Sequence, residues 1–173
     1  MVDVIVSKNI HIFGDNISTD LIIPGKYKFK TTDATALAEH AMEGADPEFS
    51  KKAQEGDIII GGENFGCGSS REQAPLALKG LGIKAIVAKS FARIFYRNAL
   101  NLGIPLIESR DIVDDVKPGD VLEIDFKNGF VKNLRLSKTY RIKPIPAFLL
   151  NMIDAGGLVP FYRKYGRLPW QEL

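Results

Sequence analysis

Residues 57–73 read Asp-Ile-Ile-Ile-Gly-Gly-Glu-Asn-Phe-Gly-Cys-Gly-Ser-Ser-Arg-Glu-Gln, and this stretch predicts the fold. Its first part, Asp57 to Gly61, is a continuous run rich in β-branched residues, which is typical of a strand buried on both faces. A glycine-rich turn follows and leads into a helix that should end near Gly80 to Gly82. Ligand sites of α/β proteins collect at turns between a buried strand and a helix.

The turn has the residues of an anion-binding site. Gly66 and Gly68 bracket Cys67, so the backbone there can adopt positive φ and approach a ligand with no Cβ in the way. Ser69-Ser70-Arg71-Glu72 has the spacing of a capping box, and a helix beginning there would offer free N–H groups to an anion. Arg71 adds a planar guanidinium that can grip a carboxylate through two parallel hydrogen bonds.

Other features restrict this interpretation. Pro75 lies too deep for a simple first turn if the helix begins at Ser69, which favours a later start. The stretch lacks the Gly-Lys-Ser/Thr of a Walker loop, and Arg71 stands where a dinucleotide fingerprint needs its third glycine. The alternative is a glycine-rich turn with a capped helix and a surface arginine.

The sequence before and after this stretch predicts alternating strands and helices. Strands are indicated over residues 2–6, 10–13 and 85–88. One helix is indicated over residues 34–42, with Thr32 or Asp33 as its cap. A second helix should follow Ser90 as its cap, with Phe91, Ile94 and Phe95 on one face.

The last third of the chain predicts antiparallel strands. Residues 121–126 and 130–136 alternate between polar and apolar, and Asn128-Gly129 between them predicts a tight type I′ hairpin. A helix over residues 148–154 should end at Gly156. We therefore expect a mixed α/β fold, with residues 1–173 forming a single compact domain.

Composition excludes several classes of function. Lysine and arginine number 23 against 21 acidic residues, and no basic stripe gathers them, so we expect no nucleic-acid partner. The apolar runs fall far short of the roughly 20 residues that span a bilayer, and no secretory signal is expected. The single cysteine, Cys67, fits a reducing compartment such as the cytoplasm. With only His11 and His40 beside it, this chain lacks the usual ligands of a metal or iron–sulfur cluster.

Asn64-Phe-Gly-Cys-Gly-Ser-Ser-Arg-Glu-Gln-Ala closely resembles the signature of aconitase-type swivel domains. Two more segments are similar to that family: the loop over residues 13–27, and the strand and helix over residues 88–105. At this chain length the resemblance is to the small subunits of 3-isopropylmalate dehydratases. It implies a swivel domain in which a mixed β-sheet or barrel is flanked by helices.

The resemblance also implies an activity and a partner. Enzymes of this family move a hydroxyl of a hydroxy acid to the neighbouring carbon by dehydration and rehydration. Here that would interconvert 2-isopropylmalate and 3-isopropylmalate through 2-isopropylmaleate, in leucine biosynthesis. A 4Fe–4S cluster in a separate large subunit would act as Lewis acid on the hydroxyl and a carboxylate, so this chain should be active only in a heterodimer or heterotetramer. Ser69 would be the base, Ser70 and Arg71 would bind a substrate carboxylate, and Asp20 would lie near them.

The family's substrate-sorting loop corresponds to residues 24–30, where this sequence departs from many relatives. Tyr27-Lys28-Phe29-Lys30 stands where those relatives have Tyr-Leu followed by arginine or an apolar residue. Lys28 or Lys30 would suit an extra carboxylate, as in homoaconitate or citrate, whereas Phe29 would suit an isopropyl pocket. The alternative enzyme is therefore a homoaconitase or a related hydroxy-acid dehydratase.

Two alternatives fall outside this reaction. One is a stand-alone anion-binding module built on Ser69, Ser70 and Arg71, which would need no partner. The other is a cysteine hydrolase at Cys67, which would need a histidine within hydrogen-bonding reach.

The sequence indicates no catalytic role for either histidine or for two arginines, Arg93 and Arg97. His11 and His40 look isolated, because no carboxylate that could orient either ring stands beside it. Arg93 and Arg97 lie four residues apart on one helix face, so they either line a partner interface or face solvent.

Overall fold

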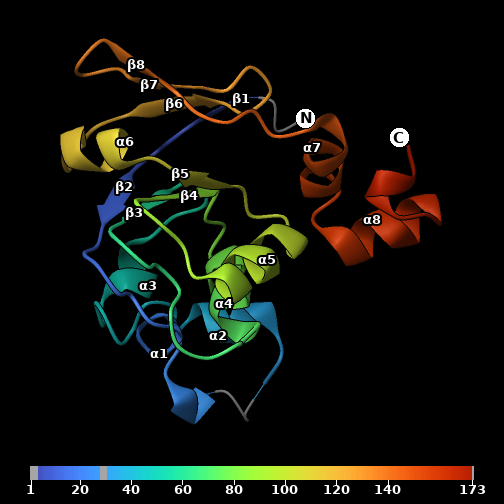
Figure 1. Ribbon diagram of the computed structural model, residues 1–173. Helices are drawn as coiled ribbons and strands as arrows, with labels where there is room; N and C mark the ends of the chain where they lie inside the picture. The colour runs from blue at the N-terminus through green and yellow to red at the C-terminus, as the bar shows by residue number, and fades with distance from the viewer. Residues whose placement is uncertain (1–3, 28–30, 173) are drawn as a thin grey trace.

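The structure is a computed structural model and describes residues 4–27 and 31–172. Lys28, Phe29 and Lys30, three residues of the expected specificity loop, lie outside the described residues. The described chain forms two four-stranded sheets and the helices that cover them (Figure 1). Within this part of the chain, no helix is both long and apolar enough to cross a membrane.

The run Asp57 to Gly61 lies inside a parallel sheet. Its strands hydrogen-bond in the order β2 (Ile10–Ile12), β3 (Ile58–Gly61), β4 (Ala85–Ala88) and β5 (Leu106–Glu108). β3 and β4 are buried along their whole length, which confirms the prediction from their continuous apolar runs. Helices α4 (Gln73–Gly80) and α5 (Arg93–Asn101) form the crossovers that parallel strands require.

An antiparallel sheet packs on one face of the parallel sheet. Its strands are ordered β1 (Val4–Val6), β6 (Leu122–Asp125), β7 (Phe130–Asn133) and β8 (Lys138–Arg141). Because strand residues alternate between faces, Ile58 and Ile60 join a core with Leu122 and Ile124, whereas Ile59 points to the other side. The mixed α/β class is confirmed, with the parallel and antiparallel strands in separate sheets.

Helices cover the opposite face of the parallel sheet, below it in Figure 1. The core on this side gathers Ile59 and Ile86 from the sheet, Leu37 from α2, Leu78 from α4 and Phe95 from α5. The remaining helical elements are α1 (Thr19–Ile22), η1 (Gly25–Tyr27), α2 (Ala34–Ala38), α3 (Phe49–Lys52), α6 (Arg110–Asp115), α7 (Ala147–Asp154), α8 (Leu158–Tyr165) and η2 (Pro169–Glu172).

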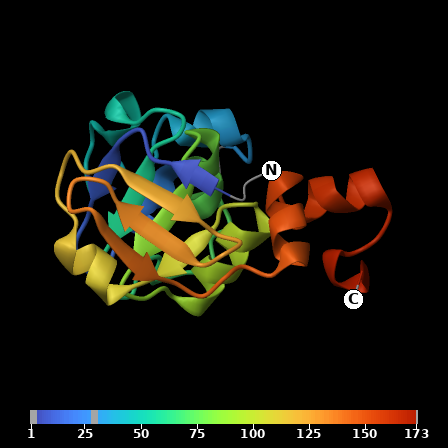
Figure 2. The same ribbon diagram turned by 90° about the horizontal axis from the view of Figure 1, so that it is seen from above.

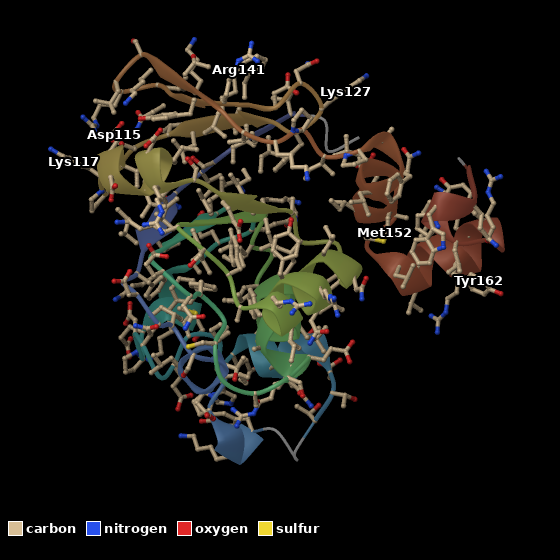
Figure 3. The ribbon with its side chains drawn as sticks, in the orientation of Figure 1. Asp115, Lys117, Lys127, Arg141, Met152 and Tyr162 are labelled. Atoms are coloured by element: carbon tan, nitrogen blue, oxygen red, sulfur yellow. The ribbon has the colours of Figure 1, made fainter. Side chains whose placement is uncertain are left out.

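The two C-terminal helices extend to one side of the sheets (Figure 2). Figure 3 shows Met152 of α7 on the side of that helix that faces α8, and Tyr162 farther out along the chain. Met152 is buried, whereas Tyr162 is 53% exposed. The helix predicted over residues 148–154 is confirmed, and Gly156, with φ of 90°, follows its end as expected.

Tertiary contacts shorten one predicted helix. α2 ends at Ala38, although the sequence pattern predicts helix as far as Met42. Asp33 caps its start, because the Ala36 N–H donates to the Asp33 carboxylate at 2.9 Å. Met42 has φ of 59°, and its N–H donates to the carbonyl of Ile22 at 2.6 Å. That hydrogen bond ties the chain to α1 and takes it out of the helical path.

The β6–β7 hairpin forms as predicted, but with a different turn. Asp125 pairs with Phe130, so four residues lie in the loop instead of two. A type I′ turn needs positive φ at both central residues, and of Asn128 and Gly129 only Gly129 has it, at 75°. Asn128 instead donates its backbone N–H to the Asp125 side chain at 2.8 Å, which stabilises the wider turn.

Packing against α5 fixes the path of the glycine-rich turn. Gly66 has φ of 80°, and a Cβ built on it would lie 2.1 Å from Cγ of Phe95. The Phe95 ring in turn packs edge-on against Phe65 at a centroid distance of 5.5 Å. Gly66 is therefore required both by its conformation and by the close approach of an aromatic side chain.

The buried carboxylate of Asp120 links the turn that precedes β6 to strand β7. Asp120 is 2% exposed, accepts from Asn133 Nδ2 at 2.6 Å and from the Lys117 N–H at 3.1 Å, and pairs with Arg135. The hydrogen bond from Arg135 lowers the pKa of Asp120 to about 2.

We expect Asp120→Asn to lower the free energy of unfolding by about 2 kcal/mol near neutral pH, because charge-assisted hydrogen bonds are lost. The ordinary pKa of the aspartate is 3.8, so the stabilisation is complete above that pH and is lost as pH falls through about 2. Urea unfolding of both proteins across acid pH measures this. Parallel stability curves for the two proteins would contradict the assignment.

The two glycines of the turn should respond differently to alanine. Gly66→Ala should cost about 3–5 kcal/mol, because it adds a collision with Phe95 to an unfavourable positive φ. Gly68→Ala should cost about 1–2 kcal/mol, since the nearest atom to its Cβ would be Thr19 Oγ1 at 3.3 Å. Urea denaturation of both variants makes the comparison. Equal losses would mean that Phe95 moves freely away.

Candidate active site

A short backbone bridge joins two loops that are far apart in the sequence. The Gly66 N–H donates to the Ile17 carbonyl at 2.7 Å, and the Thr19 N–H donates to the Cys67 carbonyl at 2.8 Å. Ser18 and Cys67 thereby form an isolated parallel bridge. This bridge brings the residues after Ser18 close to the residues after Cys67. Thr19 and Asp20 therefore lie beside Ser69 and Arg71.

The buried Thr19 side chain contacts both the backbone and the hydroxyl of Ser69. The Ser69 N–H donates to Thr19 Oγ1 at 3.2 Å, and the two hydroxyl oxygens are 3.4 Å apart. Thr19 is 1% exposed, whereas Ser69 and Ser70 are exposed. The Ser70 carbonyl accepts from Asn98 Nδ2 at 3.4 Å, which links this turn to α5. The paired hydroxyls predicted to act on a ligand are therefore accessible from outside.

Arg71 lies on the α1 side of the turn and pairs with Asp20. The arginine side chain is only 14% exposed, but that of Asp20 is 64% exposed. Within the described residues the buried Arg71 Nε has no hydrogen-bond partner. Gly25 of η1 borders the pair, since a Cβ built there would lie 3.6 Å from Asp20 Oδ1. An incoming carboxylate could thus replace the exposed Asp20 carboxylate at the guanidinium.

A cavity of about 330 Å³ opens on the α5 side of Ser69. Its walls come from the turn and from the first residues of α5, namely Gly66, Gly68, Ser69, Ala92, Arg93, Ile94 and Arg97. The three side chains that α5 contributes, those of Arg93, Ile94 and Arg97, are exposed. Both arginines that the sequence assigns either to a partner interface or to solvent therefore lie on the wall of this cavity.

Neither the predicted capping box at Ser69 nor the predicted cap at Ser90 forms. α4 begins at Gln73, and no side chain caps it, so Ser69 lies in the turn ahead of the helix. Pro75 consequently falls in the first turn of α4, as its position in the sequence favours. Ser90 likewise does not cap α5: it accepts from the Asn64 N–H at 2.7 Å and donates to Glu63 at 2.8 Å.

The packing of α5 differs from its predicted face in one residue. Phe95 is buried and Phe91 is half-buried, but Ile94 is 50% exposed. Ile94 faces the cavity beside Ser69 rather than the core.

Tyr27, the described aromatic residue of the expected specificity loop, is anchored to the segment after α2. Its hydroxyl donates to Glu43 Oε2 at 2.9 Å, and its ring stacks on His40 at a centroid distance of 3.6 Å. Lys26 pairs with the same carboxylate at 2.8 Å. The hydrogen bond from Lys26 is the largest influence that lowers the pKa of Glu43, to about 2. Lys26 and Tyr27, which precede residues 28–30, are therefore both held by contacts to the segment after α2.

Both histidines have carboxylate partners, contrary to the expectation from sequence. His11 Nε2 lies 2.8 Å from Asp57 Oδ2, and His40 Nδ1 lies 2.8 Å from Glu43 Oε2. Tertiary folding creates the first pair, and the turn after α2 creates the second. Within the described residues neither ring makes a hydrogen bond to Cys67, so the structure gives a cysteine hydrolase no support.

No metal-binding cluster is found in the described part of the chain, where no three His, Cys, Asp or Glu residues group to hold an ion. Sequence reasoning missed Thr19 as the partner of Ser69. Its position between Ser18 and Asp20, within a motif already singled out, was the available signal.

Comparisons with known proteins agree with this fold and with this turn. Residues 15–111 match the family described as the aconitase C-terminal domain. The small subunit of 3-isopropylmalate dehydratase from Thermodesulfovibrio yellowstonii is 53% identical over 161 residues, covering 93% of this chain and 94% of that one. The corresponding protein from Caldicellulosiruptor bescii is 50% identical over 153 residues, with 88% and 92% covered.

A solved structure extends the comparison to three dimensions. The crystal structure of 3-isopropylmalate dehydratase from Methanocaldococcus jannaschii has a TM-score of 0.85 and 47% identity, and covers 94% of this chain and 95% of that one. A protein of the same organism, named isopropylmalate/citramalate isomerase small subunit, is 49% identical over 160 residues, 92% of this chain and 95% of that one. The chain therefore belongs to the aconitase C-terminal domain family, among the small subunits of 3-isopropylmalate dehydratases.

Proposed function

We propose that this chain is the small subunit of a hydro-lyase that interconverts 2-isopropylmalate and 3-isopropylmalate through 2-isopropylmaleate. The observation that carries the proposal is the exposed Ser69 hydroxyl, which lies at a cavity and two residues from the mostly buried Arg71 with its unpaired Nε. Names of the relatives agree with this reaction and with a partner large subunit.

Ser69 acts as the base in this proposal. Its Oγ takes the proton from the carbon next to a substrate carboxylate, the hydroxyl leaves the neighbouring carbon, and both return in exchanged positions. A serine hydroxyl is a weak base in water, so its surroundings must favour the deprotonated form. Thr19 Oγ1, 3.4 Å from Ser69 Oγ, can donate a hydrogen bond to that oxygen, and a partner that covers the exposed turn would exclude water.

Arg71 binds a substrate carboxylate in this proposal. Burial leaves its guanidinium few competing waters, and the planar group can hold both carboxylate oxygens. Asp20 occupies an Nη while no substrate is bound. Because Asp20 is well exposed, exchange of its carboxylate for that of the substrate costs little desolvation. Ser70, exposed beside Arg71, is proposed to donate a hydrogen bond to the same carboxylate.

The iron–sulfur cluster of this family does not fit the residues of this chain, whose single cysteine stands in the bridge to Ser18. We therefore assign the cluster to the large subunit, where it would supply Lewis-acid chemistry toward the hydroxyl. This chain contributes the base and the carboxylate-binding groups. We expect the assembled enzyme in the cytoplasm.

The relatives' names favour isopropylmalate over the homoaconitase alternative. Lys28 and Lys30, on which the alternative rests, lie outside the described residues, as does Phe29. Turnover of the purified complex on isopropylmalate and on homocitrate separates the two enzymes. Activity on homocitrate alone would overturn the proposed substrate, and full activity of this chain without a large subunit would overturn the partner.

Ser69→Ala should reduce kcat of the assembled complex roughly 10²- to 10⁴-fold, the usual contribution of a general base. Folding and assembly should change little, because Ser69 is exposed and its backbone N–H, which alanine keeps, donates to Thr19 Oγ1. Steady-state kinetics with saturating large subunit gives the measurement, and Ser50→Ala on α3 is the matched control. A Ser69→Ala enzyme as fast as the control would remove Ser69 from the mechanism.

Arg71→Lys should lower kcat/KM roughly 10- to 100-fold although the charge is kept. Lysine still pairs with Asp20 but cannot make the two-pronged contact, so at least one charged hydrogen bond is lost. Kinetics of the complex, with thermal unfolding as the check on folding, measures the effect. Unaltered kinetics would mean that Arg71 does not touch the substrate and only stabilises the turn through Asp20.

A further inference from the structure

The short helical turn η1 borders the Asp20–Arg71 pair, and the proposed roles of these two residues do not explain how that turn is held in place. A Cβ built on Gly25 of η1 would lie 3.6 Å from Asp20 Oδ1 and 4.0 Å from Arg71 Nη2. The backbone of η1 therefore passes close to the guanidinium that a substrate carboxylate is proposed to reach. The position of η1 thus sets the space that the carboxylate finds there.

Among the described residues, the carboxylate of Glu43 contacts polar groups of three side chains. It accepts from the Tyr27 hydroxyl at 2.9 Å, pairs with Lys26 at 2.8 Å and lies 2.8 Å from His40 Nδ1. Lys26 and Tyr27 are the last two residues of η1. The Tyr27 ring also stacks on His40, with the ring planes 9° apart. Glu43 therefore joins η1 to the segment after α2.

The segment that carries Glu43 is itself fixed against α1. The Met42 N–H donates to the Ile22 carbonyl at 2.6 Å. The Gly44 N–H donates to the Leu21 carbonyl at 3.1 Å. A Cβ built on Gly44 would lie only 2.7 Å from Leu21 Cα, so the two backbones are in direct contact. Because both neighbours of Glu43 are bonded to α1, its carboxylate projects from a fixed backbone.

These contacts form a closed path beside the proposed carboxylate site. α1 carries Asp20, η1 passes the site at Gly25, and Glu43 ties η1 back to the backbone next to α1. The Glu43 side chain is 27% exposed, so its contacts are partly shielded from water. Its charge persists at neutral pH, because the hydrogen bond from Lys26 lowers the pKa of Glu43 to about 2.

We infer that Glu43 is a positioning residue for substrate binding, because it holds η1 beside the guanidinium of Arg71. The inference rests on the proposed function of Arg71 and extends it to a residue outside the carboxylate site. A carboxylate held by Arg71 is bound in the ground state as well as in the transition state. A displaced η1 should therefore weaken substrate binding more than it slows the chemical step.

The test measures steady-state kinetics of the assembled complex with Glu43→Ala or Glu43→Gln. Glu43→Ala removes every contact of the carboxylate and should raise KM for isopropylmalate about tenfold, with kcat within about twofold of the wild type. Glu43→Gln keeps an oxygen that can accept from Tyr27 but loses the charge beside Lys26, so KM should rise less. Glu39→Gln, which removes an exposed carboxylate at the end of α2, is the matched control and should leave KM unchanged.

A double-mutant cycle with Arg71→Lys tests whether both residues act on the same contact. If Glu43 acts through the site of Arg71, Glu43→Ala should raise KM by a smaller factor in the Arg71→Lys enzyme than in the wild type. A residue that only stabilises the fold would lower the unfolding temperature and leave KM unchanged. Thermal unfolding of each complex separates this effect from the kinetic one.

Three results would overturn the inference. A KM of Glu43→Ala equal to that of Glu39→Gln would mean that η1 keeps its place without Glu43. Equal factors with and without Arg71→Lys would mean that Glu43 acts elsewhere. A lower kcat at unchanged KM would contradict a role in binding. If Glu43→Ala does not fold, the same comparisons are made with Glu43→Gln.

Arg71→Lys alone distinguishes failure of the inference from failure of the proposed function. If Arg71→Lys is impaired while the Glu43 variants have normal KM, the inference alone fails. Unaltered kinetics of Arg71→Lys would remove the proposed role of Arg71, and the inference with it.

Discussion

The site depends on the two hydrogen bonds that join residues 17–19 to residues 66–67. These bonds, 2.7 and 2.8 Å long, bring together segments that are about 50 residues apart in the chain. They form because Gly66 adopts positive φ and turns the backbone toward Ile17. Without them Thr19 would not support Ser69, and Asp20 would not reach Arg71. The geometry needed for chemistry is thus fixed by backbone contacts that involve no catalytic side chain.

The electrostatics of the site suit a protein that works in an assembly. Arg71 is mostly buried and already has a carboxylate partner, which keeps a desolvated charge compensated before substrate arrives. Ser69, Ser70, Arg93 and Arg97 remain exposed. An exposed hydroxyl gains basicity only when water is removed and positive charge is near. A surface that is built rigidly but left open therefore fits our proposal that a second subunit completes it.

Much of the fold could be predicted from sequence because local patterns agree with the final packing. The runs of β3 and β4 are apolar on both faces, and both strands are buried on both faces. Predictions failed where a tertiary contact competes with a local one. Ser69 and Ser90 have cap-like spacing, but the Ser69 hydroxyl lies beside Thr19 Oγ1 and Ser90 Oγ accepts from the Asn64 N–H. A capping box is worth about 1 kcal/mol, so one longer-range hydrogen bond is enough to displace it.

The distinction between local patterns and tertiary contacts also explains which site residues could be predicted. Ser69 and Arg71 stand in one contiguous string, so the sequence could single them out, and the resemblance gave them roles. The residues that complete their surroundings come from loops and helices elsewhere, and no local pattern connects Ser69 to Thr19 or to Arg97. Tyr27 is the converse case: the sequence places it in the specificity loop, yet its ring and hydroxyl are engaged by His40 and Glu43. As packed here, Tyr27 anchors the start of that loop, so substrate selection by the loop would fall to its other residues.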